Sequence, residues 1–338
     1  MKEMLYSDVE QEGFPMAQKL KLKFLVQNLR HSGSRSAYTP PESAGDISIY
    51  CRARRFRERV RANDPDVILA QEGRLGWLEF FQKDPYLSAH YHVLWKERCP
   101  GIPGGDECTP LLYKKEKFDL LDSGHFWLSA TPDVCSESYE AGEGHYRIST
   151  WVKLREKESG VEFYCYTAHV DTGGITPKAS FQQYYDLFAK MAPETFAFVG
   201  GDFNFAYRTP EYQSAINWDY VADLQDMAWN LQESRECTFG GMNGSLTCGY
   251  RENIYPDENP GRERQLDYLW AKKHPHLKVD YYGFDYTPYD CSEEGVAAGY
   301  VSDHYGLVIH LTLNTEKDYS AEQTPHHYGD RPYYFKKD

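Results

Sequence analysis

An apolar run from Thr195 to Val199 is followed at once by Gly200-Gly201-Asp202-Phe203-Asn204. The run predicts a buried strand, and the two glycines permit a tight turn at its carboxyl end. Alternation along an extended chain sends Asp202 and Asn204 to one side and turns Phe203 into the core. Such a pair could hold a nucleophilic water and a phosphoryl oxygen, or the water shell of a metal. These residue types are also common in ordinary turns, so the rest of the chain must decide between the two interpretations.

Polar side chains stand at the ends of other predicted strands as well. The segment Lys19–Asn28 alternates charged and apolar residues before it becomes continuously apolar, which predicts a strand ending at Asn28. Two further apolar runs end in Glu72 and His169, and the last predicted strand follows Ser302-Asp303-His304. This recurrence predicts that one edge of a sheet sandwich gathers the following residues: Asn28, Glu72, His169, Asp202, Asn204, Asp267, Asp303 and His304.

Carboxylates dominate this predicted group. Glu72, Asp202, Asp267 and Asp303 would repel one another unless a cation or a histidinium lay among them. Ligands that offer only oxygen suit Mg²⁺ or Mn²⁺ better than zinc. The 12 histidines include no helical motif such as H-E-x-x-H, which argues against a zinc hydrolase. The sequence therefore favours a magnesium or manganese site.

The charge balance constrains the partner. The chain carries 37 basic and 51 acidic residues, a net charge of −14. It lacks the surplus of Lys and Arg with which proteins hold long nucleic acids nonspecifically. A predicted helix does place six arginines (Arg52, Arg54, Arg55, Arg57, Arg59 and Arg61) around an apolar stripe of Ile49, Ala53, Phe56 and Val60. We interpret these arginines as the solvated face of an outer-layer helix that lies away from the catalytic edge.

The predicted organisation is one large domain. No linker, repeat or low-complexity block divides the 338 residues. We expect a flexible arm at 1–18, a single domain at 19–313 and a polar tail at 314–338. No apolar run approaches the ~20 residues of a membrane-spanning helix. The first residues do not resemble a signal peptide, so a cytoplasmic location is expected unless an export signal has been removed.

The eight cysteines are scattered and form no C-x-x-C pair. Neither a disulfide framework nor a zinc site is therefore indicated, and free thiols are expected. Cys99 and Cys108 flank one loop and could pair if the protein were exported.

Taken together in order, these pieces resemble the endonuclease/exonuclease/phosphatase superfamily. The matching segments span Leu20 to Leu313 and are Gln27-Asn28, Gln71-Glu72, Ala168-His169, Gly201-Asp202-Phe203-Asn204, Leu266-Asp267-Tyr268 and Ser302-Asp303-His304. The resemblance implies a four-layered α-β-β-α sandwich, in which two mixed sheets lie face to face with helices outside.

The resemblance also implies roles for the residues around the metal. Glu72 would be the principal ligand of Mg²⁺ or Mn²⁺, with Asn28 and Asp303 close by. Asp202 and Asn204 would position the attacking water and the phosphoryl group.

Further implied roles concern two histidines and an arginine. His304 would contact the phosphate and be oriented by Asp267. His169 would do the same from the other side, with Glu107 fixing its tautomer and keeping it protonated. Arg147 resembles the phosphate-contacting arginine of the family.

The predicted function is a divalent-metal-dependent phosphoesterase in which water attacks phosphorus in line. A small phosphoester is favoured as substrate because of the acidic charge and the aromatic loops expected around the site (Ser32–Asp46, Cys99–Glu107, Gly240–Arg262 and Asp285–Val301). A DNA or RNA nuclease of the same fold is the first alternative. The second is a non-catalytic binding module, which the completeness of the predicted site disfavours.

Overall fold

The computed structural model describes residues 19–31, 36–40, 48–139, 144–171, 176–205, 221–224 and 266–322. The expected arm at 1–18, the loop Gly240–Arg262 and residues 323–338 of the expected tail lie outside this described part. Among the described helices, none is long and apolar enough to cross a membrane.

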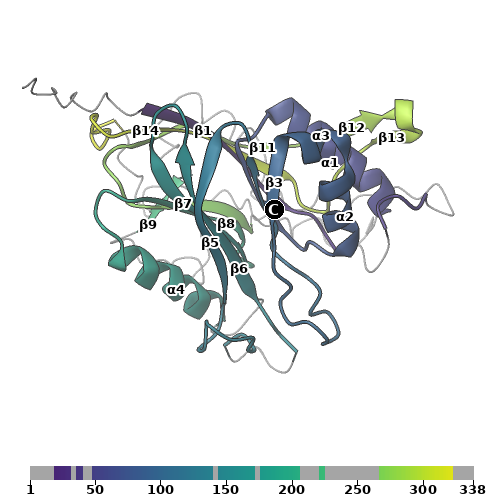
Figure 1. Ribbon diagram of the computed structural model, residues 1–338, viewed down its shortest axis with the longest axis horizontal. Coiled ribbons are helices and arrows are strands. Elements are labelled where there is room, and N and C mark those ends of the chain that lie inside the picture. The colour runs from purple at the N-terminus through teal and green to yellow at the C-terminus, as the bar shows by residue number, and fades with distance from the viewer. Residues whose placement is uncertain are drawn as a thin grey trace, which may run out of the picture.

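Two six-stranded mixed sheets lie face to face (Figure 1). The first has the order β11 (Leu277–Asp285), β14 (Gly306–Asn314), β1 (Lys19–Asn28), β2 (Val67–Gln71), β4 (Leu111–Lys114) and β3 (Tyr91–Leu94). The second has the order β5 (Phe118–Trp127), β6 (Ile148–Glu156), β7 (Glu162–His169), β8 (Phe196–Asp202), β10 (Asp267–Lys272) and β9 (Val221–Asp223). The pairs β1–β2 and β7–β8 are parallel, and they place the carboxyl ends of four central strands at one edge of the sandwich.

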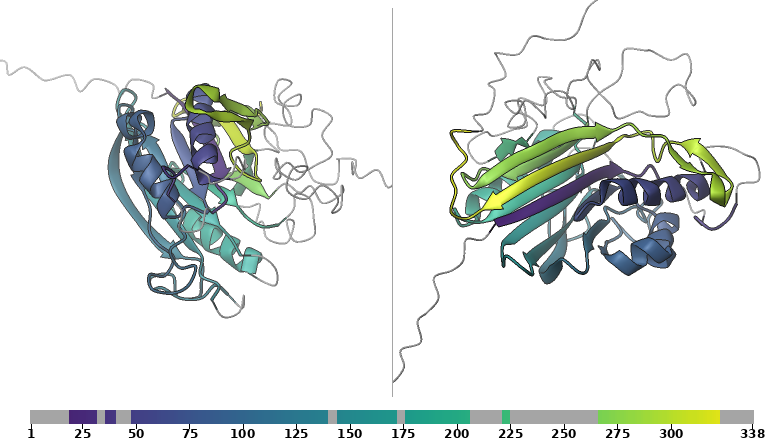
Figure 2. Two further views of the ribbon diagram at one scale, coloured as in Figure 1. Left: turned by 90° about the vertical axis from the view of Figure 1, so that its right-hand side faces the viewer. Right: turned by 90° about the horizontal axis from the view of Figure 1, so that it is seen from above.

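Helices cover the outer face of each sheet. Three of them, α1 (Ile49–Asn63), α2 (Leu75–Lys83) and α3 (Pro85–His90), pack on the first sheet, and α4 (Thr176–Lys190) packs on the second. A small hairpin of β12 (Tyr289–Cys291) and β13 (Val296–Gly299), joined through the 3-10 helix η1 (Ser292–Glu294), lies beside α1 (Figure 2). The four-layered α-β-β-α sandwich expected from the sequence is thus confirmed.

Three apolar clusters separate the layers. Between the sheets, the rings of Phe24 and Phe198 have centroids 5.2 Å apart. Burial of β1 follows from this arrangement, because Val26 faces the neighbouring sheet while Leu25 faces the helices. The strand therefore becomes apolar on both sides where both of its faces are covered, and the alternation remains only near its exposed start at Lys19.

The two glycines of β8 serve close approach rather than a turn. Both lie inside the strand, and not after it as the sequence suggested. A Cβ on Gly200 would lie 2.6 Å from Leu69 Cδ1 of the opposite sheet. One on Gly201 would lie 1.9 Å from the carbonyl oxygen of Ala168 on β7. These two glycines, which directly precede Asp202, thus let β8 come close to β2 of the opposite sheet and to β7 of its own sheet.

The interpretation of the α1 arginines as a solvated face is wrong. The apolar stripe is buried as expected, but so are Arg52, Arg54, Arg55 and Arg59. Arg55 donates from Nη2 to the carbonyl of Ala297 at 2.7 Å, and Arg59 Nε pairs with Asp285 at 3.3 Å. Long arginine side chains can reach distant carbonyl groups beyond the helix surface, so charge periodicity alone did not reveal their burial.

Arg52 also links α1 to the edge that carries the polar cluster. Its Nη1 donates to the carbonyls of Leu29 at 2.5 Å and Arg30 at 3.0 Å, directly after Asn28. The same nitrogen lies 3.5 Å from the carbonyl of Val301, just before Ser302. Helix α1 therefore binds the two loops that follow Asn28 and precede Ser302. The expectation that this helix lies away from the catalytic edge is wrong.

Residues 221–223 form strand β9, which pairs with β10. Two smaller expectations are also corrected. Much of Asp285–Val301, expected to surround the site, forms the β12–β13 hairpin against α1. Cys99 is joined by a disulfide to Cys135, with Cα atoms 5.9 Å apart, whereas Cys108 is a buried free thiol.

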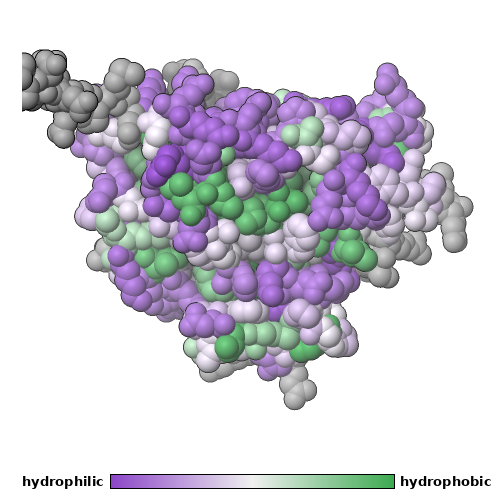
Figure 3. All heavy atoms as spheres, viewed as in Figure 1, coloured by the Kyte–Doolittle hydropathy of each residue, from purple (hydrophilic) through white to green (hydrophobic). Residues whose placement is uncertain are grey.

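The edge strand β5 is largely exposed to solvent. On the face seen in Figure 1, hydrophilic residues surround a smaller apolar band (Figure 3). Strand β5 includes the exposed residues Leu120 and Leu121, flanked by Asp119 and Asp122. These flanking charges are typical of edge strands that resist pairing with another chain.

Candidate active site

Strand register brings the predicted residues together. Asn28 lies opposite Gln71 in the parallel pair β1–β2, so Glu72 follows at the same edge. In the second sheet, Asp202 lies opposite His169 on parallel β7 and opposite Asp267 at the start of antiparallel β10. The ends of strands from both sheets therefore meet, as the sequence predicted.

Asn28 joins the two sheets at this edge. Its side chain is fully buried, and Nδ2 donates to Glu72 Oε1 at 2.9 Å and to Asp202 Oδ2 at 3.0 Å. Its Oδ1 accepts from the backbone N–H of Arg30 at 2.9 Å, which fixes the orientation of the amide. One amide thus holds two carboxylates from opposite sheets close together.

Glu72 is held as a carboxylate. Burial raises its pKa, but hydrogen bonds from Asn28 and from the His31 N–H, the latter 2.9 Å from Oε2, help to bring the pKa below its ordinary value. Its φ of 56° lies in the left-handed region, which is uncommon for a residue other than glycine. Such strained backbone tends to occur at functional sites.

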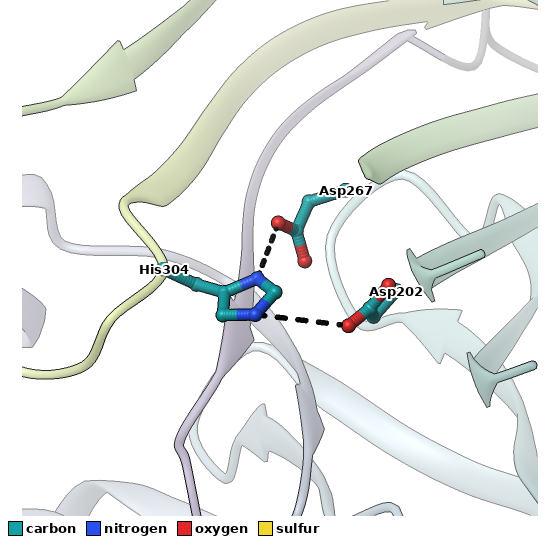
Figure 4. Close-up of side chains that lie close together, drawn as sticks. All are labelled: Asp202, Asp267 and His304. Carbon is teal, nitrogen blue, oxygen red and sulfur yellow. Dashed lines mark hydrogen bonds and ion pairs between the residues drawn. The ribbon is translucent and has the colours of Figure 1, made fainter. Parts of the chain in front are cut away.

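His304 lies between two aspartates (Figure 4). Its Nδ1 is 2.8 Å from Asp267 Oδ2, and its Nε2 is 3.8 Å from Asp202 Oδ2. Burial lowers the pKa of His304, but the surrounding carboxylates, Asp267 first, raise it well above its ordinary value. Burial in turn raises the pKa of Asp267 to about 6. The histidine is therefore cationic at neutral pH.

The ligand atoms of Asp202, Asp267 and His304 lie within 4.8 Å of one another, close enough to hold a cation. His304 already carries a proton between the two carboxylates, and this positive charge would repel a metal ion. Glu72, with Asn28 beside it, offers oxygen atoms without such a charge. The chemistry of the donors thus fits Mg²⁺ or Mn²⁺ better on the Glu72 side.

Asp303 lies at the rim of this group. Its side chain is 34% exposed, and Oδ2 is 3.5 Å from Arg30 Nη1. Ser302 Oγ donates to its other oxygen at 3.1 Å, and Gln27 Nε2 donates to the backbone oxygen of His304 at 3.1 Å. The loop that carries Asp303 and His304 is therefore bound directly to the end of β1.

Asn204 is placed by a local turn. Its backbone N–H donates to Asp202 Oδ1 at 3.0 Å, and its Nδ2 donates to the carbonyl of Val170 at 2.7 Å. Phe203 between them is fully buried against Phe181, as expected. The turn and the functional interpretations of this motif are therefore compatible.

His169 approaches Asp202 from the side opposite His304. Its Nε2 lies 3.7 Å from Asp202 Oδ2, and its Nδ1 lies 3.4 Å from Glu107 Oε1. A third side chain, which sequence reasoning missed, lies nearer, since Arg98 Nη2 is 3.0 Å from Nδ1. Arg98 stands in no recognisable motif, so nothing in the sequence identified it.

Arg147 is paired with a carboxylate that was also overlooked. Its Nε and Nη2 each lie 3.2 Å from an oxygen of the fully buried Asp171, which His145 also contacts at 2.9 Å. Burial raises the pKa of Glu107, but nearby groups, Arg98 foremost and Arg147 among them, lower it to about 2. Asp171 lies two residues after His169, a spacing that could have identified it.

The Asp267–His304 pair should behave as one unit. We expect Asp267→Asn and His304→Gln each to reduce turnover roughly 100-fold, because each destroys the same charged hydrogen bond. The double variant should be about as slow as either single variant. A double-mutant cycle measured with saturating substrate checks this, with the exposed Arg155→Met as a remote partner whose effect should multiply independently. Fully multiplicative losses for Asp267 and His304 would refute the pairing.

Comparison with known proteins adds to this geometry. A family model described as "Endonuclease/Exonuclease/phosphatase family" matches residues 43–304. The chain matches none of the curated proteins. Similar solved structures include an endonuclease/exonuclease/phosphatase family protein from Bacteroides thetaiotaomicron, with 23% identity and a TM-score of 0.68 over 88% of this chain and 99% of that one.

Two further similar structures differ in what their names say they act on or bind. One is a mannosyl-6-phosphatase of Bacteroides thetaiotaomicron, with 23% identity and a TM-score of 0.65 over 86% of this chain and 99% of that one. The other is D. rerio TDP2 complexed with single-strand DNA product, with 17% identity and a TM-score of 0.59 over 86% and 98% of the two chains. At these identities the likeness establishes the shared fold.

Proposed function

We propose that this chain, which belongs to the endonuclease/exonuclease/phosphatase family and is thus a hydrolase of phosphoester bonds, is a divalent-metal-dependent enzyme that favours small phosphoesters. The observation that supports this most is the environment of Asp202. A carboxylate 2% exposed meets Asn28 and two histidine Nε2 atoms at one point of the sandwich. Such a point offers a proton acceptor beside donors for a phosphoryl group.

Asp202 is the residue we assign to activating water. A water molecule forms a bond to phosphorus while the bond to the leaving oxygen, in line with it, breaks. Asp202 accepts the proton of the attacking water, and the leaving oxygen takes a proton from solvent. His304, held cationic by Asp267, donates from Nε2 to a phosphoryl oxygen as negative charge develops there. Asn204, anchored on Val170, and Arg147, anchored on Asp171, complete the set of phosphate-facing groups.

We assign the metal to Glu72, with Asp303 as a second carboxylate and Asn28 close by. Glu72 and Asp303 offer oxygen ligands, which is the chemistry that Mg²⁺ and Mn²⁺ prefer. Asn28 turns its Nδ2 toward Glu72 and its amide oxygen toward the N–H of Arg30, so it orients the ligand. A divalent ion bound there supplies charge that stabilises the developing negative charge on the phosphoryl oxygens. Asn28 keeps Glu72 and Asp202 in a fixed relation, so the ligand and the proposed base are positioned by one amide.

The preference for small phosphoesters rests on charge. The net charge of −14 opposes long polyanions, and four arginines of α1 are buried in contacts within the protein, so they do not form a surface for phosphates. The mannosyl-6-phosphatase of the same fold is a relative named for a small substrate. The TDP2 structure with single-strand DNA product favours the alternative, a nuclease.

The proposed function is tested by comparing substrates under one condition. With Mg²⁺ or Mn²⁺ at physiological salt, we expect turnover of sugar phosphates, nucleotides or other small phosphoesters, with Asp202→Asn as the inactive control. Plasmid DNA should be nicked far more slowly, because contacts to several phosphates would be needed to hold it. Efficient nicking without turnover of any small phosphoester would replace this proposal by the nuclease.

A further inference from the structure

Arg98 is buried beside the site although no role has been assigned to it. It lies in the loop between β3 and β4, and its side chain is 8% exposed. Its backbone N–H donates to the carbonyl of Glu107 at 3.0 Å, and its own carbonyl accepts from Trp127 Nε1 at 2.6 Å. The backbone of Arg98 is therefore held at both of its polar atoms, and the guanidinium is placed by its own contacts with Glu107 and His169.

The guanidinium lies between an acid and a histidine. Arg98 Nη2 forms an ion pair with Glu107 and lies 3.0 Å from His169 Nδ1, whereas Glu107 Oε1 is 3.4 Å from the same Nδ1. Burial lowers the pKa of Arg98 to about 10, so the group is still protonated at neutral pH. A guanidinium can only donate hydrogen bonds. At 3.0 Å it leaves Nδ1 of His169 no role except that of acceptor.

We propose that Arg98 is a positioning residue that fixes His169 as a neutral imidazole with its proton on Nε2. The Nη2–H of Arg98 donates to Nδ1 of His169, so the single proton of the ring lies on Nε2, the nitrogen that faces Asp202. Glu107 then neutralises Arg98 and does not hold the histidine directly. This differs from the expectation that Glu107 keeps His169 protonated.

The two histidines at Asp202 thus become chemically different. The Nδ1 atom of His304 faces the carboxylate of Asp267, which can only accept, so this ring donates from Nδ1. The Nδ1 atom of His169 faces the guanidinium of Arg98, which can only donate, so this ring accepts at Nδ1. The two rings that present Nε2 to Asp202 therefore carry their protons differently. The catalytic consequence rests on the proposed function, in which the Nε2–H of His169 donates to a phosphoryl oxygen.

The tautomer is measured without any substrate. In protein labelled with ¹⁵N-histidine, His169 is identified by comparison with His169→Gln. We expect an unprotonated Nδ1 and a protonated Nε2 at neutral pH. In Arg98→Met the carboxylate of Glu107 becomes the nearest partner, so Nδ1 should gain a proton. A wild-type His169 that carries a proton on Nδ1 would overturn the proposal whatever the enzyme hydrolyses.

Activity separates Arg98 from Glu107. Arg98→Met should reduce turnover roughly 100-fold, and Glu107→Gln, which keeps the guanidinium on His169, should remain at least about tenfold faster than Arg98→Met. The double variant Arg98→Met/Glu107→Gln removes the Glu107 carboxylate that Arg98→Met leaves unpaired. If Arg98→Met alone does not fold, the double variant tests whether turnover needs the guanidinium beside His169. Recovery of activity in the combined variant, or a larger loss for Glu107→Gln than for Arg98→Met, would mean that Arg98 only neutralises Glu107. Arg155→Met, exposed on β6, is the matched control and should be unaffected.

Discussion

Replacing Asp202 by Asn should slow turnover by roughly 10³-fold, because the amide cannot accept a proton from the attacking water. The change keeps the size of the side chain and leaves an oxygen for the N–H of Asn204. Steady-state kinetics with saturating substrate measures the loss in kcat. A KM close to that of the unchanged enzyme would place the defect in the chemical step and not in binding.

The matched control is Asp119→Asn on the exposed strand β5. Its carboxylate is 57% exposed and lies 3.8 Å from Lys157, so its loss should change neither turnover nor folding. Circular dichroism and a thermal melt should show that Asp202→Asn still folds, with some loss of stability because its new amide faces Nδ2 of Asn28. Turnover within a few-fold of the unchanged enzyme would remove Asp202 from the role of base.

Replacing Glu72 by Gln should weaken binding of Mg²⁺ or Mn²⁺ by about 100-fold or more and abolish most activity, because the principal charged ligand is lost. Calorimetry gives the affinity directly. A thermal melt gives a second reading, since a ligand that binds only the folded state raises its melting temperature. The unchanged protein should therefore be stabilised by the ion, and Glu72→Gln should not.

Glu116→Gln provides the control for this change, because Glu116 is exposed in the turn between β4 and β5. It should bind the ion as the unchanged protein does. Unaltered affinity in Glu72→Gln would move the metal to another set of residues, and the cluster of Asp202, Asp267 and His304 would be the next to test.

The amino-acid sequence determined the layers and the edge at which the polar residues meet. Apolar runs such as Phe24–Val26 and Phe196–Val199 are buried on both faces, and a strand of that kind belongs in the middle of a sandwich. A polar residue directly after such a run must then lie at the edge of the sheet. This local rule placed Glu72, His169 and Asp202 together without knowledge of any contact.

Pairing across the edge could be predicted where the chain offered a recognisable motif. The expected partnership of Asp267 with His304 corresponds to a contact of 2.8 Å. Glu107 was also expected beside His169, and the two lie 3.4 Å apart. The sequence could not reveal that Arg98 also contacts His169, because these two residues are 71 positions apart in the chain.

Only the tertiary structure decided where the long basic side chains end. Arg52 lies on a helix whose apolar stripe was read correctly, yet its guanidinium meets the carbonyl of Val301, 249 positions away. An arginine side chain spans several bonds, so the position of its Cα does not determine which groups its nitrogens contact. The strand-end carboxylates are short and stay near their strands, whereas Arg52 and Arg98 are buried because distant backbone and side-chain acceptors come within their reach.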